Sequence, residues 1–227
     1  MPAAPPRILP LFPLTGSLLL PGNWLPLNVF ETRYRNLVAD SLAEGRHIGM
    51  IQPLLPQQDN RPPLLLLPED ASDGPELYSV GCAGRIEQCD LQPDGRYLVL
   101  LKGVSRFRLD AELPLHRGYR RAAAEYAEFA GDFLEPELPL DASRAMSALQ
   151  TFGKAHGLSF DFDLLASLPG VSLVNGLAVA LPFGPAEKQA LLEADRPECR
   201  LELLLALMGM GLDAEPQADY YAPPILH

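Results

Sequence analysis

The stretch Leu9–Gly49 reads LPLFPLTGSLLLPGNWLPLNVFETRYRNLVADSLAEGRHIG. Two short apolar segments, Leu9–Leu11 and Leu25–Val29, are separated by Pro-Gly and other turn residues, and this pattern predicts two strands. The following segment, Glu31–Ala43, predicts a helix because its apolar residues form one stripe, namely Tyr34, Leu37, Val38 and Leu42. Gly45 suits the left-handed residue that ends many helices. The stretch therefore predicts strand, turn, strand and helix within one module.

Apolar runs separated by turn residues continue to Phe129. The clearest hairpin places Arg85–Cys89 opposite Tyr97–Leu101, because the intervening Asp94-Gly95 supplies the positive φ angles that a tight turn requires. Further strands are expected at Ile48–Gln52, Tyr78–Ile86, Phe107–Glu112 and Arg120–Phe129. This many strands with short links favour a small closed or nearly closed β-barrel. Three glycines are expected to permit bulges or close strand approach, namely Gly81, Gly84 and Gly103.

From about Asp141 the apolar period becomes helical. The first stripe ends near Gly157 and comprises Ala142, Ala145, Met146, Leu149 and Phe152. Further helices are expected at Val171–Leu181, at Lys188–Ala194 with Pro185 in its first turn, and at Leu201–Met208 with Asp195 and Glu198 as its cap. Helices this short are marginal alone, so they predict a packed bundle.

The predicted fold class is α+β, with an N-terminal β-barrel that carries one inserted helix and a C-terminal helical bundle. The expected parts are a barrel subdomain at 1–130, a connection at 131–140, a helical subdomain at 141–211 and a tail at 212–227. The proline-rich segment Pro53–Glu76 is expected to form a surface loop inside the first part.

Composition favours a compact cytoplasmic protein. The chain has 227 residues, 48% hydrophobic residues and a formal net charge of -11. It contains no run of about 18 apolar residues to span a bilayer, and its first residues lack the basic and apolar regions of a secretory signal. The negative charge disfavours binding to a phosphate backbone, which depends on cationic contacts.

No catalytic or metal site is expected. The chain lacks a Gly-x-x-x-x-Gly-Lys-Ser/Thr phosphate loop and a Gly-x-Ser-x-Gly turn, and Lys102 and Ser105 would point to opposite faces of a strand. The three cysteines, of which at least one must be unpaired, and the scattered histidines show no metal-ligand spacing. The cysteines are expected in strand and helix cores: Cys82, Cys89 and Cys199. The acidic groups Glu69, Asp70 and Asp73, and Asp161 with Asp163, are interpreted as loop solvation and helix capping. No cofactor is predicted.

The order of motifs resembles the LON domain, the substrate-binding region at the N-terminus of Lon-type ATP-dependent proteases. The likeness begins with the segments 9–14, 20–22, 25–27 and 30–35, which read LPLFPL, LPG, LPL and FETRYR. It continues through 80–86, 94–96 and 102–108, and ends in the helical region 177–204. The chain thus resembles a LON domain along most of its length, without the nucleotide-binding motif of the ATPase.

The resemblance implies a stand-alone, non-catalytic LON-domain module that binds unfolded or extended polypeptide or a partner protein, with a role in protein quality control. The first loop, Thr15–Leu25, is the expected binding surface, with Leu18, Leu19 and Trp24 as apolar anchors. The alternative is that these three side chains pack against the helical half. Other motif residues are interpreted as structural, namely Phe30, Glu31, Arg33, Tyr34, Arg106 and Phe107. Phe30 and Tyr34 are expected to seat the helix, and Glu31 is expected to pair with Arg106.

Two alternatives remain. The barrel of LON domains is similar to the PUA fold of many RNA-modifying proteins, and the segment His116–Arg121, which reads HRGYRR, offers three arginines for an RNA-binding module. A small-ligand site in the cleft between the two halves is the other alternative. The tail segment Asp219–His227 is predicted to lie along this domain or a second copy and so to mark where peptide ligands bind, with a frayed terminus as the alternative. The oligomeric state is left open.

Overall fold

The computed structural model describes residues 5–54, 74–133 and 140–211, and the chain divides into two compact units, Met1–Glu135 and Pro136–His227. The acidic residues near Asp70, most of the segment Pro53–Glu76 and the tail segment Asp219–His227 lie outside the described residues. Within the described part of the chain, no helix combines the length and the hydropathy needed to cross a membrane.

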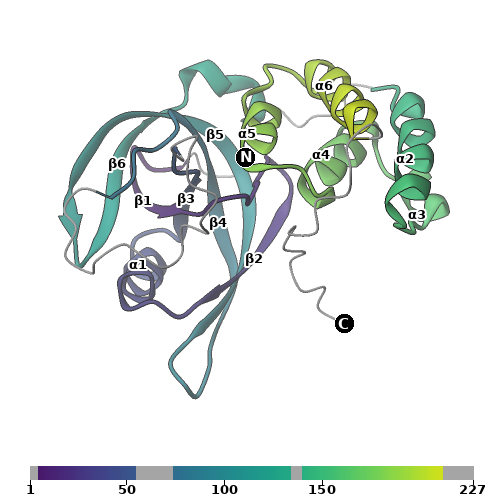
Figure 1. The fold of residues 1–227 in the computed structure, drawn as a ribbon. Helices are drawn as coiled ribbons and strands as arrows, with labels where there is room; N and C mark the ends of the chain where they lie inside the picture. The colour runs from purple at the N-terminus through teal and green to yellow at the C-terminus, as the bar shows by residue number, and fades with distance from the viewer. Residues whose placement is uncertain (1–4, 55–73, 134–139, 212–227) are drawn as a thin grey trace. The chain divides into compact units, whose positions relative to one another are not determined.

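The first unit is built on a mixed sheet (Figure 1). Its strands are β1 (Ile8–Pro13), β2 (Trp24–Val29), β3 (His47–Ile51), β4 (Val80–Leu91), β5 (Tyr97–His116) and β6 (Tyr119–Glu125). The pairing order is β2-β5-β4-β3-β1-β6, and β5 also pairs with β6, so the pairings from β5 through β4, β3, β1 and β6 return to β5. The β1–β3 pair is parallel, whereas the other pairs are antiparallel.

The β4–β5 pair confirms the predicted hairpin and its turn. Ile86 lies opposite Leu101 and Cys89 opposite Val99, and Gly95 adopts a φ of 84° in the turn. Register shifts interrupt the ladder beside Gly84 and after Ile86. The first residues of β5 pair with β2, and its last residues pair with β6. Strand β5 therefore joins the two ends of the pairing order (Figure 1).

Helix α1 (Thr32–Ala43), the one α-helix among the described residues of this unit, packs against β1, β3 and β6. Tyr34, Leu37 and Val38 are buried, as the stripe predicts, and the Tyr34 ring stacks on Phe12 with centroids 4.3 Å apart. Gly45 has a φ of 105°, which confirms the expected turn out of the helix.

Close backbone approach explains two of the glycines singled out by the sequence. A Cβ on Gly81 would lie 2.5 Å from the Met50 carbonyl oxygen and 2.6 Å from the buried Phe107 ring. A Cβ on Gly103 would lie 2.1 Å from the Leu20 carbonyl oxygen. These contacts bring β4 and the loop before β2 closer to their neighbours than any larger residue would allow.

The second unit contains α2 (Ser143–His156), α3 (Phe162–Ala166), α4 (Gly170–Ala180), α5 (Pro185–Glu193) and α6 (Pro197–Met210). Helix α6 packs against α2, α4 and α5 (Figure 1). Its buried Arg200 side chain donates hydrogen bonds to the Leu191 carbonyl oxygen at 2.8 Å and to Asn175 Oδ1 at 2.9 Å. A buried arginine therefore ties α6 to α4 and α5.

The helix ends confirm some capping predictions and correct others. Gly157 ends α2 in the left-handed conformation, and the Asp161 carboxylate caps α3 by accepting from the Leu164 amide at 3.0 Å. The predicted cap of α6 was wrong, because Arg196 occupies the N-cap position and makes no side-chain capping bond. Pro197 instead begins α6, since its missing N–H costs nothing in the first turn. The prediction of buried cysteines was wrong for Cys199, which is exposed.

Candidate functional site

Of the three predicted anchors in and after the loop that precedes β2, one is exposed to solvent. Leu18 and Leu19 are each only 2% exposed, whereas Trp24 is 49% exposed. Backbone hydrogen bonds fix this loop to β5, from the Gly22 amide to the Gly103 carbonyl oxygen at 2.9 Å and from the Gly103 amide to the Asn23 carbonyl oxygen at 2.8 Å. The expectation that Leu18 and Leu19 would be exposed was wrong, because the close approach at Gly103 turns the loop onto the sheet.

Trp24 begins a mainly apolar surface, here called the outer β2–β5 face. The register pairs Trp24 with Lys102, Pro26 with Leu100 and Asn28 with Leu98. Paired residues on adjacent strands project to the same side, so these side chains share one face of the sheet. The face consists of Trp24, Pro26, Asn28, Leu98, Leu100 and Lys102.

The exposure of the outer β2–β5 face is unequal. Pro26 and Leu98 are exposed, and Leu100 is half-buried. Lys102 places Nζ 5.4 Å from the centroid of the Trp24 ring, a cation–π contact that holds the indole over β5. Sequence reasoning missed Pro26 and Leu98, because the run Leu98–Leu101 is continuously apolar and does not show which side chains face outward.

The predicted pair between Glu31 and Arg106 was wrong. Glu31 instead accepts from Arg33 at 2.7 Å, two residues away. Arg106 is buried, and it donates from Nε and Nη2 to the Asp132 carboxylate, each at 2.9 Å, while its backbone amide donates to the same carboxylate. Asp132 lies in the 3-10 segment η2 (Ala127–Phe133), which packs on β5.

Two aromatic residues of the FETRYR motif have different environments. Tyr34 is buried against Phe12, and burial raises the pKa of its hydroxyl. Phe30 is 57% exposed, so the expectation that it seats the helix was wrong. The Arg33 guanidinium lies 4.7 Å from the Tyr34 ring centroid and covers the ring from outside. Tyr34 is therefore buried against β1, with Arg33 over its ring.

The basic segment His116–Arg121 is bonded within its own unit. Arg117 forms an ion pair with Asp40 on α1, and Arg120 donates to Glu112 and to the Pro75 carbonyl oxygen, both at 2.7 Å. Arg121 donates to the Pro114 carbonyl oxygen at 3.3 Å. Carboxylates therefore neutralise two of the arginines, which reduces the positive charge available to a phosphate backbone.

Asp40 also contacts Tyr119 and His116 of the segment His116–Arg121. The Tyr119 hydroxyl donates to Asp40 Oδ2 at 2.9 Å, and His116 Nε2 lies 3.6 Å from the same oxygen. Burial raises the pKa of the Tyr119 hydroxyl, and the hydrogen bond to the Asp40 carboxylate raises it further. The cluster fastens the β5–β6 turn to α1.

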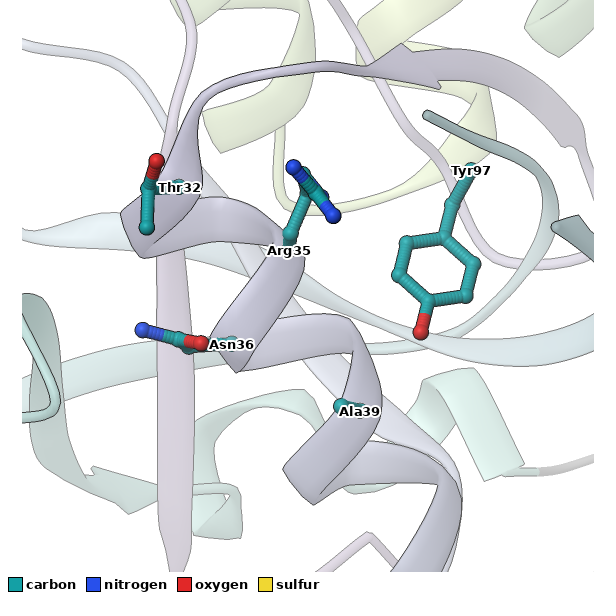
Figure 2. Close-up of a pocket in the computed structure, with 5 residues that line it drawn as sticks. All are labelled: Thr32, Arg35, Asn36, Ala39 and Tyr97. Atoms are coloured by element: carbon teal, nitrogen blue, oxygen red, sulfur yellow. The ribbon is translucent and has the colours of Figure 1, made fainter. Parts of the chain in front are cut away.

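A shallow depression of about 190 Å³ lies beside α1 and is lined by Thr32, Arg35, Asn36, Ala39 and Tyr97. Figure 2 shows Arg35 and Tyr97 on opposite sides of it. The Asn36 amide already donates to the Arg117 carbonyl oxygen at 3.0 Å, so one lining group is occupied. Small-molecule sites typically enclose roughly 300–1,000 Å³. The depression is therefore too small to define such a site.

Within the described ranges, no three histidine, cysteine or acidic residues come together as metal ligands.

Comparisons with known proteins point to one family. Residues 8–209 match the family described as the ATP-dependent protease La (LON) substrate-binding domain. Lon protease 2 of Sorangium cellulosum is 29% identical over 211 residues, which are 90% of this chain and 25% of that protein. The Lon protease of Escherichia coli is 30% identical over 212 residues, again 90% of this chain and 25% of that protein. The chain thus spans about a quarter of the length of these relatives.

Solved structures share the fold. The Lon N-terminal domain protein from Xanthomonas campestris has a TM-score of 0.60 at 28% identity, over 88% of this chain and 97% of that chain. The N-terminal domain of the Mycobacterium avium complex Lon protease also has a TM-score of 0.60, over 89% and 98% of the two chains, and at 16% identity it shows the fold alone. The matched region covers both compact units of this protein, and the chain belongs to the LON substrate-binding domain family.

Proposed function

We propose that this protein is a non-catalytic module that binds extended or unfolded polypeptide, or a partner protein that presents such a segment. The observation that carries the proposal is the outer β2–β5 face, where Trp24 projects beside Pro26 and Leu98 in a domain of a substrate-binding family. Exposed aromatic anchors supply large contact area at small entropic cost. Segments of unfolded proteins offer the apolar side chains that such a face can bury, which suits a role in protein quality control.

The ring of strand pairings supports our interpretation of the first unit as a PUA-like barrel. The fold by itself does not choose between polypeptide and RNA. Polypeptide is favoured because the arginines of the segment His116–Arg121 are bonded internally and the chain carries a net charge of -11. The exposed Trp24 side chain lies on the outer β2–β5 face, whereas the arginines lie on β6 and its preceding turn.

Trp24→Ala tests this proposal. The variant is expected to bind reduced, carboxymethylated lactalbumin, a permanently unfolded protein, about tenfold more weakly than wild type, because truncating an aromatic anchor removes its contact area. Binding is measured by fluorescence anisotropy of the labelled lactalbumin. Leu115→Ala is the matched control, since Leu115 is 47% exposed but lies outside the outer β2–β5 face. Equal affinities of the two variants would contradict the assignment of the face.

Purified protein is expected neither to hydrolyse ATP nor to cleave casein. The physical reason is that the sequence contains neither a phosphate loop to hold a nucleotide nor a Gly-x-Ser-x-Gly turn to present a nucleophile. Phosphate release and the appearance of acid-soluble peptides measure the two activities. Turnover that persists through repurification and is lost on a single substitution would show that the chain is an enzyme.

A further inference from the structure

Strand β2 lies at one end of the pairing order, so among the described residues it is hydrogen-bonded only to β5. An edge strand carries unpaired backbone groups that can pair with another chain. Proteins usually protect such edges with charged side chains, yet β2 reads WLPLNV and contains none. Pro26 is its one protective residue, because proline lacks an N–H.

The backbone groups that point to the open side follow from the register. Trp24 lies opposite Lys102, and the Gly103 amide donates to the Asn23 carbonyl oxygen at 2.8 Å. In an antiparallel ladder this bond flanks a non-hydrogen-bonded pair, so the backbone of every second residue points away from the partner strand. Trp24, Pro26 and Asn28 are these residues. The open edge therefore presents the amides of Trp24 and Asn28 and the carbonyl oxygens of all three.

The side chains beside the open edge of β2 define which kind of ligand would be complementary to it. Trp24 and Pro26 offer apolar surface next to the open backbone groups. Lys102 carries its charge to within 5.4 Å of the Trp24 ring centroid, and within the described ranges no carboxylate forms an ion pair with it. A complementary ligand thus combines free backbone amides and carbonyls, apolar side chains, and one carboxylate near Trp24.

We propose that the open edge of β2 accepts an extended polypeptide segment as an added strand, with apolar side chains over Trp24 and Pro26 and an acidic residue near Lys102. This inference rests on the proposed function and deepens it by naming the binding mode. Backbone hydrogen bonds supply affinity that does not depend on sequence, and the side chains supply selectivity. Pro26 limits the pairing to short segments, because it interrupts the row of donors at the middle of the edge.

A pair of substitutions at Asn28 separates the backbone from the side chain. Asn28→Pro removes an amide that makes no bond within the sheet, at a position equivalent to that of Pro26, and Asn28→Ala removes the side chain but keeps the amide. The probe is a fluorescein-labelled peptide, Glu-Val-Thr-Phe-Thr-Val-Thr, whose binding is followed by anisotropy. Asn28→Pro is expected to weaken binding about tenfold and Asn28→Ala by no more than about twofold, because one backbone hydrogen bond is lost only in the first. Equal binding by the two variants overturns strand addition.

A second arm uses only the wild-type protein, so it does not depend on the folding of a variant. Two versions of the probe carry N-methyl groups on alternate residues, one version on the odd and the other on the even positions. An added strand directs alternate amides toward β2, so one version is expected to lose at least about tenfold in affinity and the other to bind nearly normally. Equal affinities of the two versions overturn strand addition.

The Lys102 contact is tested by a double-mutant cycle between Lys102→Met and a probe with glutamine in place of its glutamate. A coupling of about threefold is expected for an exposed ion pair. Absence of coupling overturns the placement of the acid beside Trp24. If the probe and unfolded lactalbumin both fail to bind, the proposed function itself fails. If lactalbumin binds through Trp24 while the N-methyl versions and the Asn28 variants show no difference, the proposed function stands and the strand addition fails.

Discussion

Asp132→Ala is expected to lower the free energy of unfolding of the first unit by about 3 to 5 kcal/mol, because it removes the carboxylate from a buried guanidinium. The side chains of Arg106 and Asp132 are only 6% and 10% exposed. The guanidinium also lies 4.8 Å from the Phe129 ring centroid, so little water can replace the lost partner. Urea unfolding, followed by far-UV circular dichroism and by the fluorescence of the single tryptophan, Trp24, measures the change.

The neighbouring pair of Arg108 and Glu128 is the matched control. It joins the same strand to the same 3-10 segment, but its side chains are 44% and 52% exposed. Glu128→Ala is expected to change the free energy of unfolding little, since water solvates the exposed Arg108 guanidinium once its partner is removed. A loss for Asp132→Ala no larger than that for Glu128→Ala would refute the importance of the buried pair. The double variant Arg106→Met, Asp132→Leu is expected to recover most of the stability, because neither charge remains buried.

Gly103→Ala is expected to destabilise the first unit by about 3 kcal/mol. The added Cβ would lie 2.1 Å from the Leu20 carbonyl oxygen and 2.7 Å from its carbonyl carbon, and backbone atoms cannot swing aside as a flexible side chain can. The substitution is therefore expected to push the loop that carries Leu20 away from β5. The thermal unfolding midpoint gives the size of the effect, and lactalbumin binding shows whether the displaced loop also disturbs Trp24.

Gly176→Ala is the control for the loss of a glycine without a clash. Gly176 lies in α4, and a Cβ there would have no atom within 4 Å. The substitution is expected to stabilise the second unit by up to about 1 kcal/mol, because alanine loses less conformational freedom in a helix than glycine does. If Gly103→Ala were as well tolerated as Gly176→Ala, the close approach of the loop to β5 would not be required by the fold.

Local features of the fold could be predicted because their causes lie within a few residues. The Asp94-Gly95 turn sets the β4–β5 hairpin, and Gly157 ends α2, since both depend on a positive φ that glycine adopts without strain. The stripe of α1 predicts its buried face for the same local reason. The α6 cap was missed because aspartate is the preferred capping residue, which favours Asp195, whereas the helix begins at Pro197 and so places Arg196 at the N-cap.

The candidate site could be predicted only in part. Trp24 is exposed as expected, but Leu18 and Leu19 are buried, because hydrogen bonds to Gly103 some eighty residues away decide which side of the loop faces the sheet. The ion-pair partner of Arg106 could likewise not be predicted from the sequence pattern, because Asp132 and Glu31 are both acidic. Only the packing of η2 on β5 brings Asp132, and not Glu31, to Arg106.

The sequence by itself determined the family, the order of strands and helices, and the turns, because these depend on motifs and on the conformational preferences of neighbouring residues. Only the tertiary structure decided that β2 is an edge, that Trp24, Pro26 and Leu98 share one face, and that Arg106 pairs with Asp132. Strand pairing and register are contacts between distant residues, and many pairings satisfy the same apolar pattern. The packing of the whole sheet selects one of them, and with it the surface available to a ligand.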